Sequence, residues 1–407
     1  MSRAIRCVLS VLVLSAVVAL ESCMPAKPEI TGLTSARSAR QLSPRAAVDA
    51  VPTARPASPA TTAPKATPAS TPTASTTPTT TTTPTAATTP SAATAQPLTI
   101  AFAGDIQFEG QLRHLLDEPA TALAPIRSRL AAADLTIANL ETAVTTRGRP
   151  EDKAYTFRAA PTALDALAAA GVDVVTMANN HGVDFGPQGL ADTLAAVDNA
   201  PLAVVGIGRD AAQAFAPHVA TIRGTSVAVL GATAFDDPTA RHYPAGANRA
   251  GVAVALDPER LIAAVREARR TNDVVIVYLH WGIERVPCPT RDQRSLAHRL
   301  ARAGADIVIG SHAHVLLGTG RLGRTYVGYG LGNFVWRNRN SVPEITTGVL
   351  TLTLNGRAVT ASTWAPAIVG ADGLPHFTTG DTAERMRRAF AKLRSCTDLA
   401  PLADAPS

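Results

Sequence analysis

Short apolar runs of the β type recur along the chain from residue 97 onward, and each of them ends in polar side chains. The first reads LTIAFAG and is followed by Asp105, and later runs end near Asn139, Asn179 or His280. Because these runs are short and rich in β-branched residues, they predict buried strands rather than helices. We expect strands within residues 98–104, 134–142, 172–182, 273–282, 305–314 and 326–334.

Segments with helical periodicity separate several of these runs. Residues 257–270 read DPERLIAAVREARR, in which Asp257 is expected to cap the helix and Pro258 to be its first residue. The other predicted helices cover residues 161–171, 186–200 and 290–304, the last of them ending at Gly304. Alternating strands and helices predict a layered α/β domain whose central strands are largely parallel.

The C-terminal part of the chain predicts a hairpin and one more helix. Residues 347–369 alternate in the manner of a β-hairpin with Asn355 and Gly356 at its turn, and we expect this hairpin to close the second sheet of a sandwich. Residues 381–395 are amphipathic, and their apolar side favours packing on the core over binding to a partner. That apolar side consists of Met386, Phe390 and Leu393.

Composition divides the 407-residue chain into four parts. Residues 1–23 have the basic start and apolar stretch of a secretory signal, and Cys23 is the expected site of lipidation, with ordinary cleavage or an uncleaved anchor as alternatives. Residues 24–96 are rich in Thr, Pro, Ala and Ser and predict a disordered linker, because they have too little apolar surface to bury. The folded domain is expected at residues 97–370, and a C-terminal helix and tail at 371–407.

The net charge of +6 does not point to nucleic acid, because the arginines are scattered and no recognition motif accompanies them. We therefore expect no nucleic-acid partner and attribute the charge to solubility at the cell envelope. Two of the four cysteines, Cys288 and Cys396, fall in the expected folded part. Export allows either a disulfide between them or two free thiols.

Side chains of the metal-ligand type follow the predicted strands. Because the carboxyl ends of parallel strands meet at one edge of a sheet, we expect these side chains to lie together. Their oxygen and nitrogen donors suit one or two divalent ions of Mn, Zn or Fe, and the absence of a thiolate from this edge disfavours a structural zinc knuckle. The expected donors are Asp105, Glu141, Asn180, His280, His312 and His314.

Six motifs in this order and spacing resemble the CapA family of bacterial capsule-biosynthesis proteins, which is associated with poly-γ-glutamate synthesis and export. The motifs read FAGDIQ, NLET, ANNHGVDFG, LHWGIE, GSHAHV and GLGNF. The resemblance covers about residues 97–369. It implies a domain similar to the calcineurin-like metallophosphoesterases, with a layered β-sandwich flanked by helices.

The resemblance also implies roles for individual residues. Asp105 takes the place of the first acidic ligand, Glu141 that of a bridging carboxylate, and Asn180 that of the asparagine ligand. His181 corresponds to the proton donor to a leaving oxygen, and Gln107 stands where metallophosphoesterases carry another histidine ligand. The remaining histidine ligands correspond to His280, His312 and His314. The expected pocket-lining residues are Gln107, Asn139, Asn179, Trp281, Glu284 and Asn333.

Two hypotheses about function follow. In the first, the protein is a metal-dependent hydrolase of a phosphate ester or a related envelope substrate, with His181 as the general acid. In the second, it is a surface-tethered component that binds or assembles an anionic polymer, and its metal site is structural or vestigial. Both place the protein outside the cytoplasm and anchored to the membrane through its N-terminus. Both leave room for polymer synthase or export partners.

Overall fold

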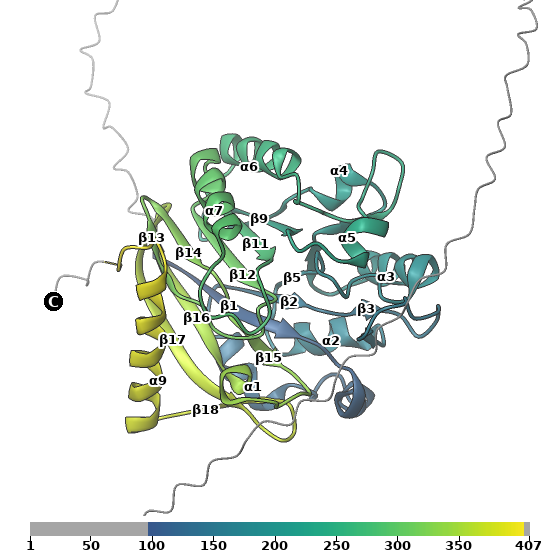
Figure 1. Cartoon of the computed structure of the whole chain (residues 1–407), viewed down its shortest axis with the longest axis horizontal. Coiled ribbons are helices and arrows are strands. Elements are labelled where there is room, and N and C mark those ends of the chain that lie inside the picture. The colour runs from purple at the N-terminus through teal and green to yellow at the C-terminus, as the bar shows by residue number, and fades with distance from the viewer. Residues whose placement is uncertain (1–96, 403–407) are drawn as a thin grey trace, which may run out of the picture. The chain divides into compact units, whose positions relative to one another are not determined.

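Two β-sheets lie face to face at the centre of the protein, and helices cover their outer faces (Figure 1). This computed structural model describes residues 97–402. The predicted signal segment, the lipidation site at Cys23, the linker and the end of the tail lie outside the described residues. The layered β-sandwich flanked by helices that the sequence predicts is confirmed.

The first sheet has eight strands within residues 97–402, in the order β18, β17, β16, β1, β2, β5 and β6, with β15 beside β1. The strands β1, β2, β5, β6 and β15 pair in parallel, whereas β16, β17 and β18 extend the sheet by antiparallel pairing. The bounds are β1 (Leu98–Ile106), β2 (Leu135–Leu140), β5 (Val174–Thr176), β6 (Ala203–Val205), β15 (Asn333–Val335), β16 (Thr346–Asn355), β17 (Ala358–Val369) and β18 (Pro375–Phe377).

The second sheet has six strands in the order β13, β14, β12, β11, β9 and β8, and its four inner strands run parallel. The bounds are β8 (His218–Ile222), β9 (Thr225–Thr233), β11 (Val274–His280), β12 (Ile307–Ser311), β13 (Thr319–Leu322) and β14 (Thr325–Gly328). Two short pairs stand apart, β3 (Ala143–Val144) with β4 (Arg158–Ala159) and β7 (Ile207–Gly208) with β10 (Gly251–Val252).

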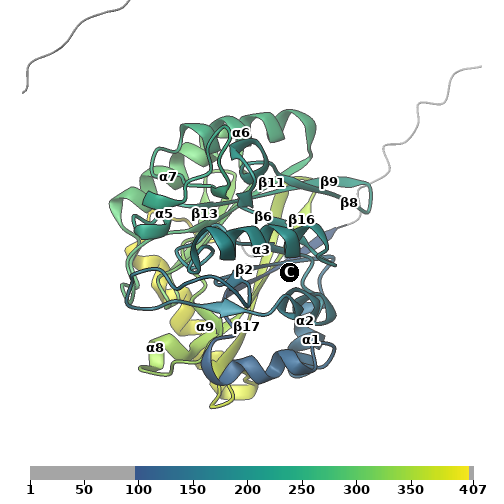
Figure 2. The same cartoon turned by 90° about the vertical axis from the view of Figure 1, so that its right-hand side faces the viewer.

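Strand alternation divides the apolar side chains among three layers. Ile100 and Phe102 of β1 point into the layer between the two sheets, where they belong to one cluster with Ile276 of β11. Ala101 and Ala103 point to the opposite face of the first sheet. The helices α1, α2 and α3 cover that face, and α6 and α7 cover the outer face of the second sheet, as Figure 2 shows from the side.

The predicted helices are confirmed, with one error at a terminus. The helix α6 begins at Glu259, and Pro258 holds the N-cap position without a side-chain cap, so the predicted cap at Asp257 is one residue too early. A capping box of Thr290 and Gln293 starts α7, a feature that the sequence interpretation missed. No helix within residues 97–402 combines the length and apolar character needed to cross a membrane.

The helices and the two 3₁₀ segments have the following bounds: α1 (Ala124–Leu130), α2 (Thr162–Ala169), α3 (Gly186–Asp198), α4 (Ala211–Ala214), α5 (Pro238–His242), α6 (Glu259–Thr271), α7 (Arg291–Ala303), α8 (Val342–Ile345), α9 (Gly380–Lys392), η1 (Gly110–Asp117) and η2 (Leu393–Cys396).

The C-terminal hairpin forms as predicted but lies in a different sheet. Its turn contains Gly356 at φ 55°, a left-handed conformation that glycine adopts at little cost. The strand β16 pairs with β1, so the hairpin extends the first sheet, and the expectation that it closes the second sheet is wrong. The reason is that β16 buries Leu350, Leu352 and Leu354 on the face of the first sheet that packs against the second.

The helix α9 packs on the end of the intersheet layer, as its apolar side predicts. Phe390 is buried against Trp364 of β17, with ring centroids 4.4 Å apart, and Met386 and Leu393 pack on the same cluster. Cys288 and Cys396 form a disulfide with their Cα atoms 5.7 Å apart, so the paired alternative of the sequence interpretation is the correct one. The disulfide ties the loop after β11 to η2.

Candidate metal centre

The six predicted donors come from strand ends in both sheets, which meet at one end of the sandwich. Asp105 lies at the end of β1, Glu141 directly after β2, and Asn180 in the loop after β5. His280 is the last residue of β11, while His312 and His314 follow β12. The structure thus brings the predicted residues to one end of the molecule, but two sheets supply them rather than one edge of a single sheet.

Close backbone contact places Asp105. A Cβ atom at Gly104 would lie 1.9 Å from the carbonyl oxygen of Gly332, so only glycine allows β1 to approach the segment before β15 so closely. The Asp105 amide donates to that same oxygen at 2.9 Å. The Asp105 carboxylate thereby reaches the space between the two sheets.

The Asp105 carboxylate is fully buried and well supplied with donors. Its Oδ1 accepts a hydrogen bond from Asn139 Nδ2 at 2.8 Å, and its Oδ2 accepts one from the His312 amide at 3.1 Å. His314 Nδ1 lies 3.3 Å from the same Oδ2. Burial alone would raise the pKa of Asp105, but the hydrogen bonds and the charge of His314 outweigh burial and lower it.

Glu141 has the opposite environment. It is fully buried, and neither carboxylate oxygen has a hydrogen-bond partner. The Nε2 atoms of His181, His280 and His314 lie 3.8, 3.8 and 3.9 Å from its Oε1, too far for hydrogen bonds. Burial, followed by the negative charge of Asp105, raises the pKa of Glu141 well above its ordinary value. The carboxylate lies in a position that a cation would satisfy.

His280 and His312 are held neutral. Burial and then the neighbouring imidazoles lower the pKa of His280 well below its ordinary value and bring that of His312 to about 3. His280 Nε2 lies 2.7 Å from Asn180 Oδ1 and 3.0 Å from His312 Nδ1, and His312 Nε2 is buried without a partner. A neutral imidazole offers a lone pair, which is the form that binds metals.

The loop after β12 has unusual backbone geometry. His312 and His314 have φ angles of 89° and 55°, in the left-handed region that residues with a side chain seldom adopt. With these angles, the His312 amide and the His314 imidazole both contact Asp105 of the first sheet. The strain is maintained because the surrounding contacts fix the loop.

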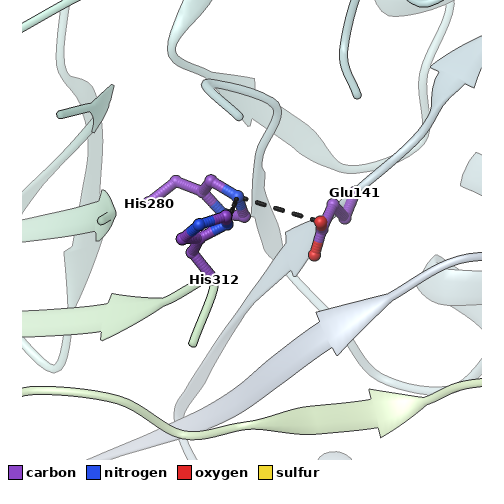
Figure 3. Close-up of side chains that lie close together, drawn as sticks. All are labelled: Glu141, His280 and His312. Atoms are coloured by element: carbon purple, nitrogen blue, oxygen red, sulfur yellow. Dashed lines mark hydrogen bonds and ion pairs between the residues drawn. The ribbon is translucent and has the colours of Figure 1, made fainter. Parts of the chain in front are cut away.

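Two groups of donors fit a metal ion, and Glu141 belongs to both. The first consists of Glu141, His280 and His312, which Figure 3 shows facing one another, and the second of Asp105, Glu141 and His314. Within each group the ligand atoms lie within 4.8 Å of one another. This set of carboxylate and imidazole donors without a thiolate suits Mn, Zn or Fe. The unpartnered atoms of Glu141 and His312 show that the residues fit such an ion.

A histidine and an aspartate next to this cluster form a second feature. His181 Nδ1 lies 2.5 Å from Asp184 Oδ2, and Lys153 Nζ lies 2.6 Å from Asp184 Oδ1. Because a carboxylate only accepts, Nδ1 carries a proton, and Nε2 is left facing Glu141. Sequence reasoning named His181 but missed Asp184 and Lys153, although Asp184 is part of the motif ANNHGVDFG.

Aromatic rings enclose the imidazoles. Phe157 stacks on His181 with centroids 3.9 Å apart, and Phe235 lies 3.8 Å from His312. On the other side, Trp336 lies 4.6 Å from His314. None of the three aromatic residues was identified from the sequence, since each lies in a loop or short strand far along the chain from the histidine that it covers.

Three of the six expected pocket-lining residues have contacts within the cluster. Asn139 bonds Asp105, and Asn179 Nδ2 donates to Asn139 Oδ1 at 3.0 Å. Asn333 Oδ1 lies 2.9 Å from His314 Nδ1. Gln107 is fully buried near the end of β1, and its Nε2 has no partner.

The other two expected lining residues lie elsewhere. Trp281 follows His280 by one residue and so points to the other face of the sheet, where it stacks on Tyr329 and donates to its carbonyl oxygen at 2.9 Å. The Glu284 side chain is 45% exposed beside Arg285. Their assignment to the pocket is therefore corrected.

Acid is expected to destabilise the metal-free protein, because the buried His312 imidazole has a lowered pKa. His312 has an ordinary pKa of 6.5 when unfolded and about 3 when folded, so between these values the unfolded chain binds more protons. Stability is therefore complete above pH 6.5 and falls, by about 1.4 kcal/mol per pH unit at most for this group, as the pH drops towards 3. Urea titrations in EDTA from pH 8 to pH 4 measure this slope. His312→Asn should have a shallower slope, and an equal slope would contradict the assignment.

Fold and donor set together define a four-layer α/β protein with a candidate metal centre between the strand ends of its two sheets. The chain belongs to a family described as bacterial capsule synthesis protein PGA_cap, which matches residues 99–338. The predicted family resemblance is thereby confirmed.

Three relatives from other bacteria are similar to this chain over part of their length. The PGA biosynthesis protein CapA of Bacillus subtilis is 32% identical over 244 residues, which cover 59% of this chain and 63% of that protein. The capsule biosynthesis protein CapA of Bacillus anthracis is 29% identical over 59% of this chain and 60% of its own length. A probable polyglutamine synthesis accessory protein of Mycobacterium tuberculosis is 34% identical over 45% of this chain and 50% of its own. The chain thus spans less than two thirds of these relatives.

Solved structures with partial similarity include a hypothetical protein from Thermus thermophilus, with a TM-score of 0.43, 19% identity and coverage of 66% of this chain and 98% of that one. Another is described as a novel phosphatase from Mycoplasma pneumoniae, with a TM-score of 0.42, 15% identity and coverage of 67% and 94%.

Proposed function

We propose that this protein is a cell-envelope hydrolase of the phosphoesterase type that serves the synthesis or export of an anionic capsule polymer such as poly-γ-glutamate. The observation that carries the hydrolase part is the environment of Glu141, a buried carboxylate without a single donor but with three imidazoles just beyond hydrogen-bond distance. Leaving a buried charge unpaired costs several kcal/mol, and one divalent cation beside Glu141 would remove that cost.

A bound divalent cation supplies Lewis acidity towards a phosphoryl oxygen and towards water. The chain contributes the remaining chemistry. Asp105, Glu141 and the histidines of the second sheet would hold the cation, and Asn180 orients His280 through its 2.7 Å contact. His181 Nε2 faces the cluster, and in its imidazolium form His181 would give the Nε2 proton to the leaving oxygen, while Asp184 accepts from Nδ1 and fixes the ring.

The polymer part of the proposal rests on family membership and on the relatives, which are named for capsule and poly-glutamate synthesis. A secretory signal and lipidation at Cys23 would place the domain on the extracytoplasmic side of the membrane, beyond a long linker. Polymer synthase or export proteins are then the natural partners, and either the polymer or a phosphoester attached to it is the substrate class.

Elemental mass spectrometry of the purified protein tests the metal site first. One or two equivalents of Mn, Zn or Fe are expected, and a His312→Ala, His314→Ala double variant should lose them. The loaded protein is then screened against phosphate monoesters and diesters. Wild-type protein without metal after incubation with Mn or Zn would overturn the hydrolase proposal.

A second function is favoured by the depth of the site. Asp105, Glu141, His280 and His312 are fully buried, and even the His314 side chain is only 12% exposed. Such burial suits a metal that stabilises the fold of a non-catalytic polymer-binding or assembly component. This alternative predicts metal in the protein without turnover of any phosphoester, and polymer export that depends on the presence of the protein alone.

A further inference from the structure

The helix α9 lies beside β17 of the first sheet, as Figure 1 shows. A groove of about 530 Å³ runs along one side of this helix. Three arginines line this groove: Arg129, Arg387 and Arg394. The groove also contains hydroxyl groups, and Trp364 and Phe390 provide an apolar floor. No carboxylate lines it.

A second groove of about 480 Å³ lies on the other side of α9. It is lined by Arg285 and Arg385 over an apolar floor that includes Leu316 and Met386, and again by no carboxylate. Phe390 belongs to both grooves, so they meet at α9. Three other cavities in the described part of the chain differ, because carboxylates such as Asp192 line them alongside arginines.

The sequence of this segment accounts for the charge. Between residues 385 and 397 it carries five cationic side chains, namely Arg385, Arg387, Arg388, Lys392 and Arg394. Glu384, one turn before Arg387, pairs with it, and four of the five have no such partner among the described residues. The apolar side of α9 is used for core packing, so the cationic side chains lie at or near the surface. Arg387 donates to the Trp364 carbonyl and Arg394 to the Thr319 carbonyl, which holds both guanidinium groups at the first groove.

The second groove adjoins the candidate metal centre through the chain itself. The Arg285 amide donates to the Ala313 carbonyl at 2.8 Å, between the two metal-ligand histidines. Val315 and Leu316, which line the groove, directly follow His314. A ligand that lies along α9 would therefore reach the loop that carries His312 and His314.

We propose that α9 and its two grooves bind an extended polymer with regularly spaced carboxylates, of the poly-γ-glutamate type. Guanidinium groups bind carboxylates through two parallel hydrogen bonds, and the apolar floors fit the methylene groups between successive amides of such a chain. The location of the site rests on charge and shape alone. The identity of the ligand rests on the proposed role in capsule polymer synthesis.

Binding of fluorescently labelled poly-γ-glutamate to the 407-residue chain tests this site. The variant Arg387→Gln, Arg394→Gln removes two charges from the first groove, and Arg388→Gln, Lys392→Gln removes two from the same helix outside both grooves. We expect the groove variant to bind on the order of tenfold more weakly and with a weaker salt dependence. The affinity of the Arg388→Gln, Lys392→Gln variant should stay within about twofold of the wild-type value.

Additional measurements separate this site from folding and from the metal centre. Arg387→Lys, Arg394→Lys keeps the charge but loses the guanidinium fork, so it should bind with intermediate affinity even if the glutamine variant folds poorly. Polymer binding by the wild-type protein should be the same in EDTA as with added Mn or Zn, because the proposed metal ligands belong to neither groove.

Three results would overturn the site. Equal loss of affinity in the two charge-matched variants would mean that only net charge matters. Tighter binding of long-chain polyphosphate than of poly-γ-glutamate would mean that the grooves do not select carboxylates. Absence of polymer binding by a wild-type protein that does contain metal would reject the grooves while leaving the hydrolase proposal intact.

Discussion

Replacing Glu141 by glutamine is expected to stabilise the metal-free protein and, at the same time, to abolish its stabilisation by divalent metal ions. The carboxylate is fully buried and has no donor, so its charge opposes folding unless a cation is present. Glutamine has nearly the same shape and no charge. We expect the free energy of unfolding in EDTA at pH 8 to rise by about 1–3 kcal/mol, whereas added Mn or Zn should no longer raise it.

Asp105 provides a matched control, because replacing it should change the stability of the metal-free protein in the opposite direction. Its carboxylate accepts hydrogen bonds from Asn139 and the His312 amide and lies beside His314, so its charge is compensated without metal. Asp105→Asn should therefore destabilise the metal-free protein, although it removes the same charge from the same cluster. Urea denaturation of both variants, with and without metal, measures the difference. Destabilisation of metal-free protein by both substitutions to the same extent would refute our account of Glu141.

The pH dependence of this effect has a definite direction. Glu141 has a folded-state pKa raised well above 4.5, so in the metal-free wild type its penalty is absent below the unfolded value and grows as the pH rises. The advantage of Glu141→Gln should accordingly be larger at pH 8 than at pH 5. This trend is opposite to that of His312, which allows the two groups to be distinguished in one set of titrations.

The sequence located the donors because strand periodicity and chain order are enough to place them. An apolar run followed by a polar residue predicts a strand end, and parallel strands bring such ends together. This reasoning predicted that the six residues lie together, including His280 and His312, which contact one another in the structure, and their role as metal ligands stays a prediction. It could not assign the strands to sheets, because β1 and β11 have equally apolar sequences and differ only in their neighbours.

The residues that sequence reasoning missed act through contacts that periodicity does not encode. Phe157 and Trp336 cover histidines from loops or short segments, and Lys153 reaches Asp184 from a loop after β3. Trp281 was expected to line the pocket because it follows His280 in the sequence. Alternation along β11 sends the two side chains to opposite faces of the sheet. Applying the two-residue period to every motif would have corrected that assignment.

Removal of the His181 imidazole is expected to lower phosphoester turnover without removing the metal. His181 is placed beside the donors but is not needed to hold a cation, and its Nε2 lies 3.8 Å from Glu141. General acid catalysis by a positioned histidine contributes roughly 10²- to 10⁴-fold, so His181→Ala should lower kcat by that factor. The metal content and KM should change little, and the loss should be smallest for substrates whose leaving groups need no proton.

Asp184→Asn tests how His181 is oriented. The aspartate accepts from His181 Nδ1 and from the Phe157 amide, so asparagine would weaken both contacts and allow the ring to turn or change tautomer. An intermediate loss of kcat is expected.

His298 and Asp398 form a second histidine–aspartate pair on the surface, 2.9 Å apart and remote from the donors, so His298→Ala serves as the control. If His181→Ala retained full turnover of a phosphate ester with an alkoxide leaving group, the proton donor would be a group other than His181. The Gln107 amide would not be that group, because it does not titrate.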